Sequence, residues 1–197
     1  MATVTIHTLQ RKRSLRNIPK KVLIITASLR AGSNSDALAE AFAQGARDAG
    51  HCVEIISLKD KKITFCQGCL ACQNTQKCVI QDDAAALAEK IGGADVVAFA
   101  SPVYYYGLAG QLKTLLDRCN PLYSSDYAFR AVYLLATAAE EAPATFDGSI
   151  KGLQGWVDCF EKAALAETVF AGGVTAPHEI NNHPSLKRAY EVGKAII

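Results

Sequence analysis

The feature that most constrains the fold is a series of short apolar, β-branched runs, each followed by a helical pattern. Strands are expected at residues 21–26, 52–58, 95–100, 131–137 and 168–171, and helices at 36–49, 82–91, 108–122, within 149–164 and at 184–197. A strand buried on both faces reads as a nearly continuous apolar run, and parallel strands need a crossover, usually a helix. The alternation therefore predicts an α/β fold, a doubly wound parallel sheet of about five strands with helices on both faces.

Length and composition fit one domain with its own core. The chain has 197 residues, of which 50% are hydrophobic, enough to bury a core without disulfides or a metal. Residues 1–19 are polar and basic and end in Asn17-Ile18-Pro19. We interpret them as an arm outside the core, either a free tail or a segment docked on a partner subunit. The domain itself is expected at residues 20–197.

Charge and hydropathy argue against two classes of partner. The chain has 21 Lys and Arg against 19 Asp and Glu, without the basic excess typical of nucleic-acid-binding domains. Its apolar runs are far shorter than the ~20 residues that span a bilayer, and no signal peptide follows the basic N-terminus. We therefore expect no nucleic acid, no membrane and a cytoplasmic location. Thiols are normally reduced there, so the seven cysteines do not predict disulfides.

The loop after the first strand has the character of an anion site. Ligands of doubly wound sheets bind beyond the carboxyl ends of the strands. Residues 28–35 read Ser-Leu-Arg-Ala-Gly-Ser-Asn-Ser and lead into a helix N-terminus, where free N–H groups and the helix dipole favour an anion. Neither the Walker nor the G-x-G-x-x-G pattern is present. The loop suits the phosphate of a mononucleotide, with an ordinary polar loop as the alternative.

The loop after the third strand carries three consecutive tyrosines. Residues 101–107 read Ser-Pro-Val-Tyr-Tyr-Tyr-Gly, and neighbouring side chains point in different directions, so the three rings cannot all enter a core. Exposed rings suit a flat aromatic ligand, and glycine lets the backbone approach it closely. An aromatic surface or a dimer interface is the alternative. A phosphate loop and an aromatic loop at one sheet edge together predict a flavin mononucleotide (FMN) site.

These two motifs, followed by Gln-Leu-Lys and Leu-Asp-Arg within residues 111–118, resemble the NADPH-dependent FMN reductase family. The resemblance runs from about residue 21 to residue 123 and implies a flavodoxin-like fold. It departs from the family at Ala27, where glycine is common. It implies that the phosphate is held by Ser28, Arg30, Ser33, Asn34 and Ser35. It implies that the flavin ring lies along Pro102, Val103, Tyr104, Tyr105, Tyr106 and Gly107, with Thr137 and Ala138 completing the pocket.

Four of the seven cysteines form a C-x2-C-x2-C-x5-C cluster, namely Cys66, Cys69, Cys72 and Cys78. Bacterial ferredoxins use a C-x2-C-x2-C run to bind iron and sulfur, whereas zinc sites usually pair two separated C-x2-C knuckles. The spacing favours a [4Fe–4S] cluster over zinc, with free or redox-active thiols as the alternative. The segment also resembles the compact motif of the iron–sulfur flavoproteins. Cys52, Cys119 and Cys159 lie in apolar segments and are predicted core residues.

The predicted function is that of an FMN-dependent oxidoreductase. It passes electrons from NADH or NADPH to a small-molecule acceptor such as a quinone, a flavin or an azo compound. The cofactor supplies the chemistry, so no catalytic side chain is expected. Two alternatives stay open: electron transfer between a [4Fe–4S] cluster and FMN, and a non-enzymatic flavodoxin-fold binding protein. The resemblance implies a homodimer or homotetramer. We also predict an Asp117–Arg118 ion pair, and a Trp156 packed in the core or at a subunit interface.

Overall fold

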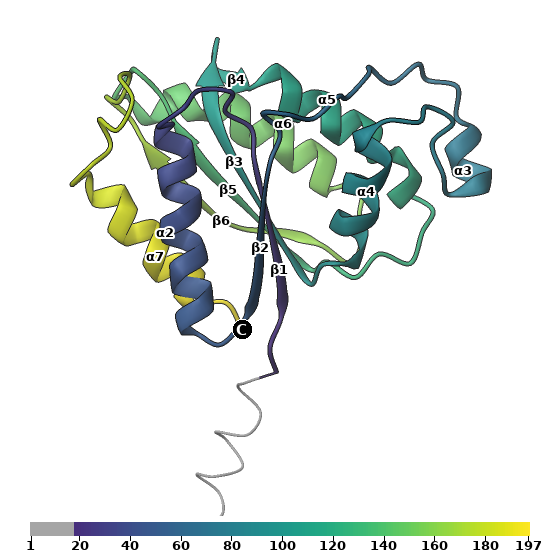
Figure 1. The fold of residues 1–197 in the computed structure, drawn as a ribbon, viewed down its shortest axis with the longest axis horizontal. Coiled ribbons are helices and arrows are strands. Elements are labelled where there is room, and N and C mark those ends of the chain that lie inside the picture. Colours follow the sequence, from purple (N-terminus) through teal and green to yellow (C-terminus); the bar gives the residue numbers. More distant parts are fainter. Residues whose placement is uncertain (1–17) are drawn as a thin grey trace, which may run out of the picture.

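The computed structural model describes residues 18–197, which form a six-stranded sheet with helices on both sides (Figure 1). Strands run in the order β2-β1-β3-β5-β6 and are parallel, while the short β4 pairs antiparallel with β3. The predicted arm lies almost wholly outside the described residues. The strands are β1 (Lys21–Thr26), β2 (Cys52–Ser57), β3 (Val96–Tyr104), β4 (Gly107–Leu108), β5 (Ala131–Thr137) and β6 (Ala164–Ala171).

Two layers of helices sandwich this sheet. The layers are visible on opposite sides of it in Figure 1. One layer consists of α2 (Asn34–Asp48) and α7 (Pro184–Lys194), and the other of α4 (Asp83–Gly93), α5 (Gly110–Arg118) and α6 (Asp147–Val157). A further short helix, α3 (Ala71–Thr75), belongs to the connection between β2 and α4. Among the described residues, every helix is too short or too polar to cross a lipid bilayer.

Strand β1 shows why the apolar runs predict this architecture. Val22 and Ile24 belong to the core cluster beneath α2 and α7, whereas Leu23 and Ile25 belong to the cluster on the opposite face. All four are 0–3% exposed. Side chains alternate between the faces of a strand, so a strand covered on both sides must be apolar at each position. Burying each of them contributes roughly 1.5–3 kcal/mol relative to exposure.

The structure corrects two element predictions. The sheet has six strands instead of five, because the chain after β3 folds back through Tyr105 and Tyr106 and pairs Gly107 with Tyr104. The helix predicted at residues 108–122 is shorter, since α5 ends at Arg118 and a 3₁₀ turn follows at Asn120–Leu122. Pro121 lies in that turn and lacks the N–H that would continue an α-helix.

Three side-chain predictions were also wrong. Cys119 is buried as expected, and burial raises the pKa of its thiol to about 12. Cys52 and Cys159, however, are exposed, one at the start of edge strand β2 and one just beyond α6. Arg118 does not pair with Asp117. It forms an ion pair with Asp82, 36 residues earlier, while Lys113 forms one with Asp117.

Trp156 packs into the core as predicted. Its ring is stacked on Phe129 at a centroid separation of 5.8 Å and meets Phe99 edge-on at 5.7 Å.

Candidate functional site

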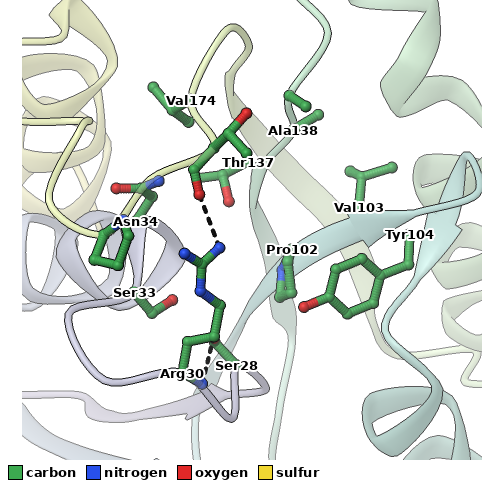
Figure 2. A pocket seen from close by; sticks show the side chains of 13 residues that line it. Ser28, Arg30, Ser33, Asn34, Pro102, Val103, Tyr104, Thr137, Ala138 and Val174 are labelled. Atoms are coloured by element: carbon green, nitrogen blue, oxygen red, sulfur yellow. Dashed lines mark hydrogen bonds between the residues drawn. The ribbon is translucent and has the colours of Figure 1, made fainter.

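A cleft of about 180 Å³ opens at the carboxyl ends of β1, β3 and β5 (Figure 2). The strand order reverses here. From β1 the sheet continues to β2 on one side, and to β3, β5 and β6 on the other. Such a reversal is where open α/β sheets bind ligands. The lining includes most of the residues named from the sequence: Ser28, Arg30, Ser33, Asn34, Pro102, Val103, Tyr104, Thr137 and Ala138.

One end of the cleft is the N-terminus of α2. Ser33 caps this helix, because its Oγ accepts a hydrogen bond from the N–H of Asp36. The Ser33 and Ser35 hydroxyls lie 3.0 Å apart, and the Oγ of the buried Ser28 accepts the N–H of Arg30 at 3.3 Å. The first N–H groups of a helix have no intrahelical acceptor. Hydroxyls, free N–H groups and the helix dipole thus converge where an anion is favoured.

A loop that the sequence analysis missed closes this end. Residues 172–182, here called the β6 loop, contribute Val174, Thr175 and Pro177 to the lining. The Arg30 guanidinium crosses the cleft and donates to the Thr175 carbonyl at 2.8 Å (Figure 2). The rule about strand ends could have found this loop, because it follows β6 at the same sheet edge.

Asn34 fastens the β6 loop to α2. Its Nδ2 donates to the Ala176 carbonyl at 2.9 Å and its Oδ1 accepts the N–H of Ile180 at 3.2 Å. Both ends of the Asn34 amide therefore bond to backbone groups of the β6 loop, so this side chain holds the loop against α2. The fit is tight at Gly32, whose φ is +66°, because a Cβ there would collide with the His178 imidazole.

The β6 loop is also fixed internally by Glu179. Its carboxylate accepts the N–H groups of Thr175 and Ala176 at 2.5 and 2.7 Å. These hydrogen bonds lower the pKa of Glu179. The Thr175 carbonyl that receives Arg30 is thereby held in a defined orientation.

The other end of the cleft is an apolar and aromatic wall. Pro102, Val103 and Tyr104 come from the end of β3, and Thr137 and Ala138 from the end of β5. In Figure 2 the Tyr104 ring lies beside Pro102, across the cleft from Asn34. This wall is suited to a flat ring, so the residues present fit both the phosphate and the isoalloxazine of FMN.

The structure separates the three tyrosines that the sequence treated together. Tyr104 lines the cleft, whereas Tyr105 and Tyr106 form the turn of the β3–β4 hairpin with φ of +47° and +61°. Tyr105 is fully exposed. The Tyr106 hydroxyl donates to the Glu140 carboxylate at 3.2 Å, an interaction that raises the pKa of this tyrosine. Gly107 lies beside the cleft, paired with Tyr104.

The four clustered cysteines lie away from the cleft, in the segment between β2 and α4, here called the cysteine loop (residues 59–82). Cys66 and Cys69 are exposed, Cys78 is half-buried and Cys72 in α3 is buried. All four are free thiols, which is the donor set that iron–sulfur clusters use. Among residues 18–197, however, no three metal-binding side chains lie close enough to share an ion. The ligand set therefore stays a prediction.

The base of the cysteine loop is clasped by Arg118. This side chain is completely buried and donates to both carboxylate oxygens of Asp82, at 2.7 and 2.9 Å. It also donates to the Thr64 carbonyl at 2.7 Å and the Ile80 carbonyl at 3.2 Å. Burial would raise the pKa of Asp82, but hydrogen bonds from Arg118 and from the N–H groups of Thr64 and Ala84 outweigh it and lower the pKa to about 2. The Arg118 guanidinium thus bonds to residues near both ends of the cysteine loop.

Two curated relatives show which known proteins the chain resembles. An iron–sulfur flavoprotein of Methanocaldococcus jannaschii is 38% identical over 102 residues, or 52% of this chain and 53% of that protein. The chain thus matches about half the length of that relative. An iron–sulfur flavoprotein of Archaeoglobus fulgidus is 35% identical over 157 residues, which cover 79% of this chain and 71% of that protein.

The fold likewise has a close solved counterpart, and a family profile matches the chain. An NAD(P)H:quinone oxidoreductase from Methanothermobacter marburgensis superposes with a TM-score of 0.67 at 20% identity, over 90% of this chain and 99% of the other. At that identity the likeness concerns the fold. Residues 20–146, which contain the α2 N-terminus, the tyrosine hairpin and the four clustered cysteines, match the profile of NADPH-dependent FMN reductase. Because this match covers more than half of the chain, the protein belongs to the NADPH-dependent FMN reductase family.

Proposed function

We propose that this chain is an FMN-dependent oxidoreductase that passes electrons from NADH or NADPH to a small-molecule acceptor such as a quinone, a flavin or an azo compound. The observation that carries the proposal is the cleft, which offers an anion site at one end and an apolar wall at the other. FMN, when bound, supplies the hydride and electron chemistry. The side chains bind it, orient it and exclude water.

The anion end would hold the phosphate. The Ser28 and Ser33 hydroxyls and the first N–H groups of α2 are neutral donors, and Arg30 adds a positive charge. Charge-assisted hydrogen bonds are about twice as strong as neutral ones. Arg30 already points across the cleft toward Thr175, so it would need little reorientation to meet a phosphate below the β6 loop.

The apolar end would hold the ring. Pro102 to Tyr104 and the end of β5 would cover part of the isoalloxazine, leaving the open side of the cleft to the nicotinamide and then the acceptor. In the described part of the chain, no carboxylate, imidazole or thiol lines the cleft. Its hydroxyl, amide and apolar side chains would position the reactants.

The test compares FMN with riboflavin, which lacks the phosphate. Flavin-free protein titrated with each, followed by fluorescence quenching, should bind FMN at least 10-fold more tightly. Loaded protein mixed without oxygen with NADH or NADPH should lose the visible absorbance of oxidised flavin, and should regain it when a quinone is added. Equal affinity for the two flavins, or a flavin that neither nicotinamide bleaches, would contradict the proposal.

A second function is favoured by the cysteine cluster and by the iron–sulfur relatives. We propose that Cys66, Cys69, Cys72 and Cys78 hold a [4Fe–4S] cluster, which would supply one-electron exchange with FMN. Because Cys66 and Cys69 are exposed, cluster assembly would draw them inward toward Cys72.

Iron analysis of protein purified without oxygen should give about four irons per chain for such a cluster. Cys69→Ser should lose the iron and keep the flavin, with the exposed Cys159→Ser as its control. Iron retained in Cys69→Ser would refute this ligand set.

We also propose a homodimer or homotetramer in the cytoplasm, without a nucleic-acid partner. The exposed tyrosine hairpin and the balanced charge support this assignment. Sedimentation of the flavin-loaded chain, with and without residues 1–19, tests both the assembly and the role of the arm. A monomer in both cases would contradict the assembly.

A further inference from the structure

The residues at the end of α5 contact the cysteine loop at several points. Asn120 Nδ2 donates to Cys72 Sγ at 3.1 Å, a hydrogen bond to the buried member of the cysteine cluster. Beyond it, Ser124 Oγ donates to the Gln73 carbonyl at 3.0 Å, and its own carbonyl accepts Gln76 Nε2 at 2.8 Å. Helix α3, which carries Cys72, is therefore held by the segment that follows α5.

Arg118 makes a second set of contacts between the end of α5 and the cysteine loop. Its guanidinium is buried, yet among the described residues its Nε has no hydrogen-bond partner. A buried donor without a partner is costly. Arg118 donates to the Ile80 carbonyl, two positions after Cys78. The end of α5 thus directs one N–H donor toward the Cys72 sulfur and another toward the backbone beside Cys78.

We propose that Arg118 and Asn120 are positioning residues for an iron–sulfur cluster, with Asn120 donating to the Cys72 ligand and Arg118 holding the frame that carries Cys78. This inference rests on the cluster proposed above. Hydrogen bonds to ligand sulfurs help to set the reduction potential of such clusters. A donor stabilises the more negative, reduced form, so Asn120 would raise the potential and slow the loss of iron.

The arrangement also links the two sites. The N-terminus of α5 follows the tyrosine hairpin, where the Ala109 N–H donates to Ser101 Oγ at 3.1 Å, and its C-terminus leads to Arg118 and Asn120. A helix of nine residues is about 13 Å long. A single rigid element would therefore set the separation between the flavin and the cluster.

The experiment uses the full chain loaded with FMN and reconstituted with iron and sulfide without oxygen. Asn120→Leu keeps the branched shape of the side chain and removes the donor. Asn74→Leu is the matched control, an exposed asparagine in α3 of the same loop. The midpoint potential is measured by spectroscopic titration, and iron release by transfer to a chelator. Asn120→Leu should have a lower potential and release iron several-fold faster, while Asn74→Leu should match the wild type.

The outcomes separate this inference from the cluster proposal. A wild-type chain that takes up no iron refutes the cluster and this role together. A wild-type chain that takes up iron, with Asn120→Leu equal to Asn74→Leu in potential and release, refutes the role of Asn120 alone. Retained FMN and far-ultraviolet circular dichroism report the fold. If Asn120→Leu loses either, Asn120→Ala, which also lacks a side-chain donor, replaces it and is judged by the same two measurements.

Discussion

The two ends of α5 hold two sites that are built in opposite ways. The cleft at one end is assembled from strand ends, a helix N-terminus and the β6 loop, with many small contacts shared among several elements. The cysteine loop at the other end is mostly exposed and includes Leu70 and Gln76 with positive φ, and its base is held by one buried cation. A single substitution should therefore shift affinity at the cleft but destabilise the structure at the loop.

The largest effect is expected from Arg118→Leu. It leaves the Asp82 carboxylate, whose side chain is 9% exposed, without its partner. Removing one partner of a buried ion pair costs about 3–5 kcal/mol of unfolding free energy. Urea denaturation measures the loss. Lys113→Leu, which removes an exposed pair on the same helix, should cost no more than about 1 kcal/mol. Equal losses of unfolding free energy in the two variants would mean that the Arg118–Asp82 ion pair does not stabilise the cysteine loop.

Arg30→Ala should affect binding at the cleft more than stability. Losing a charge-assisted phosphate contact should weaken FMN binding by about 1.5–3 kcal/mol, roughly 10- to 150-fold. Riboflavin affinity should be nearly unchanged. Arg47→Ala is the control, because Arg47 lies in the last turn of α2, with Glu40 3.9 Å away. A parallel loss of riboflavin affinity would instead assign Arg30 to the flavin ring or to the shape of the cleft.

Acid should weaken the ion pair between Arg118 and Asp82. The pKa of Asp82 is about 2 in the folded chain, below its ordinary value of 3.8, so the unfolded state binds protons first. The contribution, about 2 kcal/mol, is complete above pH 4 and is lost as the pH falls toward 2. Urea denaturation of the wild type and of Asp82→Asn should give stabilities that converge as the pH falls from 4 to 2. A constant difference over that range would place the pKa of Asp82 near its ordinary value.

The smallest effect is expected at the hairpin. Tyr105 is fully exposed with φ of +47°, and asparagine tolerates this left-handed conformation better. Tyr105→Asn should therefore leave FMN binding unchanged and raise the unfolding free energy by up to about 1 kcal/mol. Tyr123→Asn, at an exposed tyrosine with φ of −56°, should give no such gain. A loss of FMN affinity in Tyr105→Asn would indicate that Tyr105 contacts the flavin after all.

Local patterns were sufficient for the five parallel strands and for locating the loop at one end of the cleft. The apolar runs predicted strands buried on both faces because burial on each side demands an apolar residue at every position. The Ser28–Ser35 loop could be recognised because strand, loop and helix N-terminus are consecutive in the chain. Both predictions depend on contacts between near neighbours, which spacing in the sequence reports directly.

Contacts between distant residues had to come from the tertiary structure. Arg30 meets Thr175 across 145 positions, and Arg118 meets Asp82 in preference to the adjacent Asp117. The backbone turn at Tyr105 and Tyr106, not their composition, decides which ring faces the cleft. Residue types and spacing predicted which groups are present, such as the hydroxyls of the Ser28–Ser35 loop and four thiols. Which of them come together depends on how helices and loops pack, because packing selects partners by geometry and burial, which residue spacing does not record.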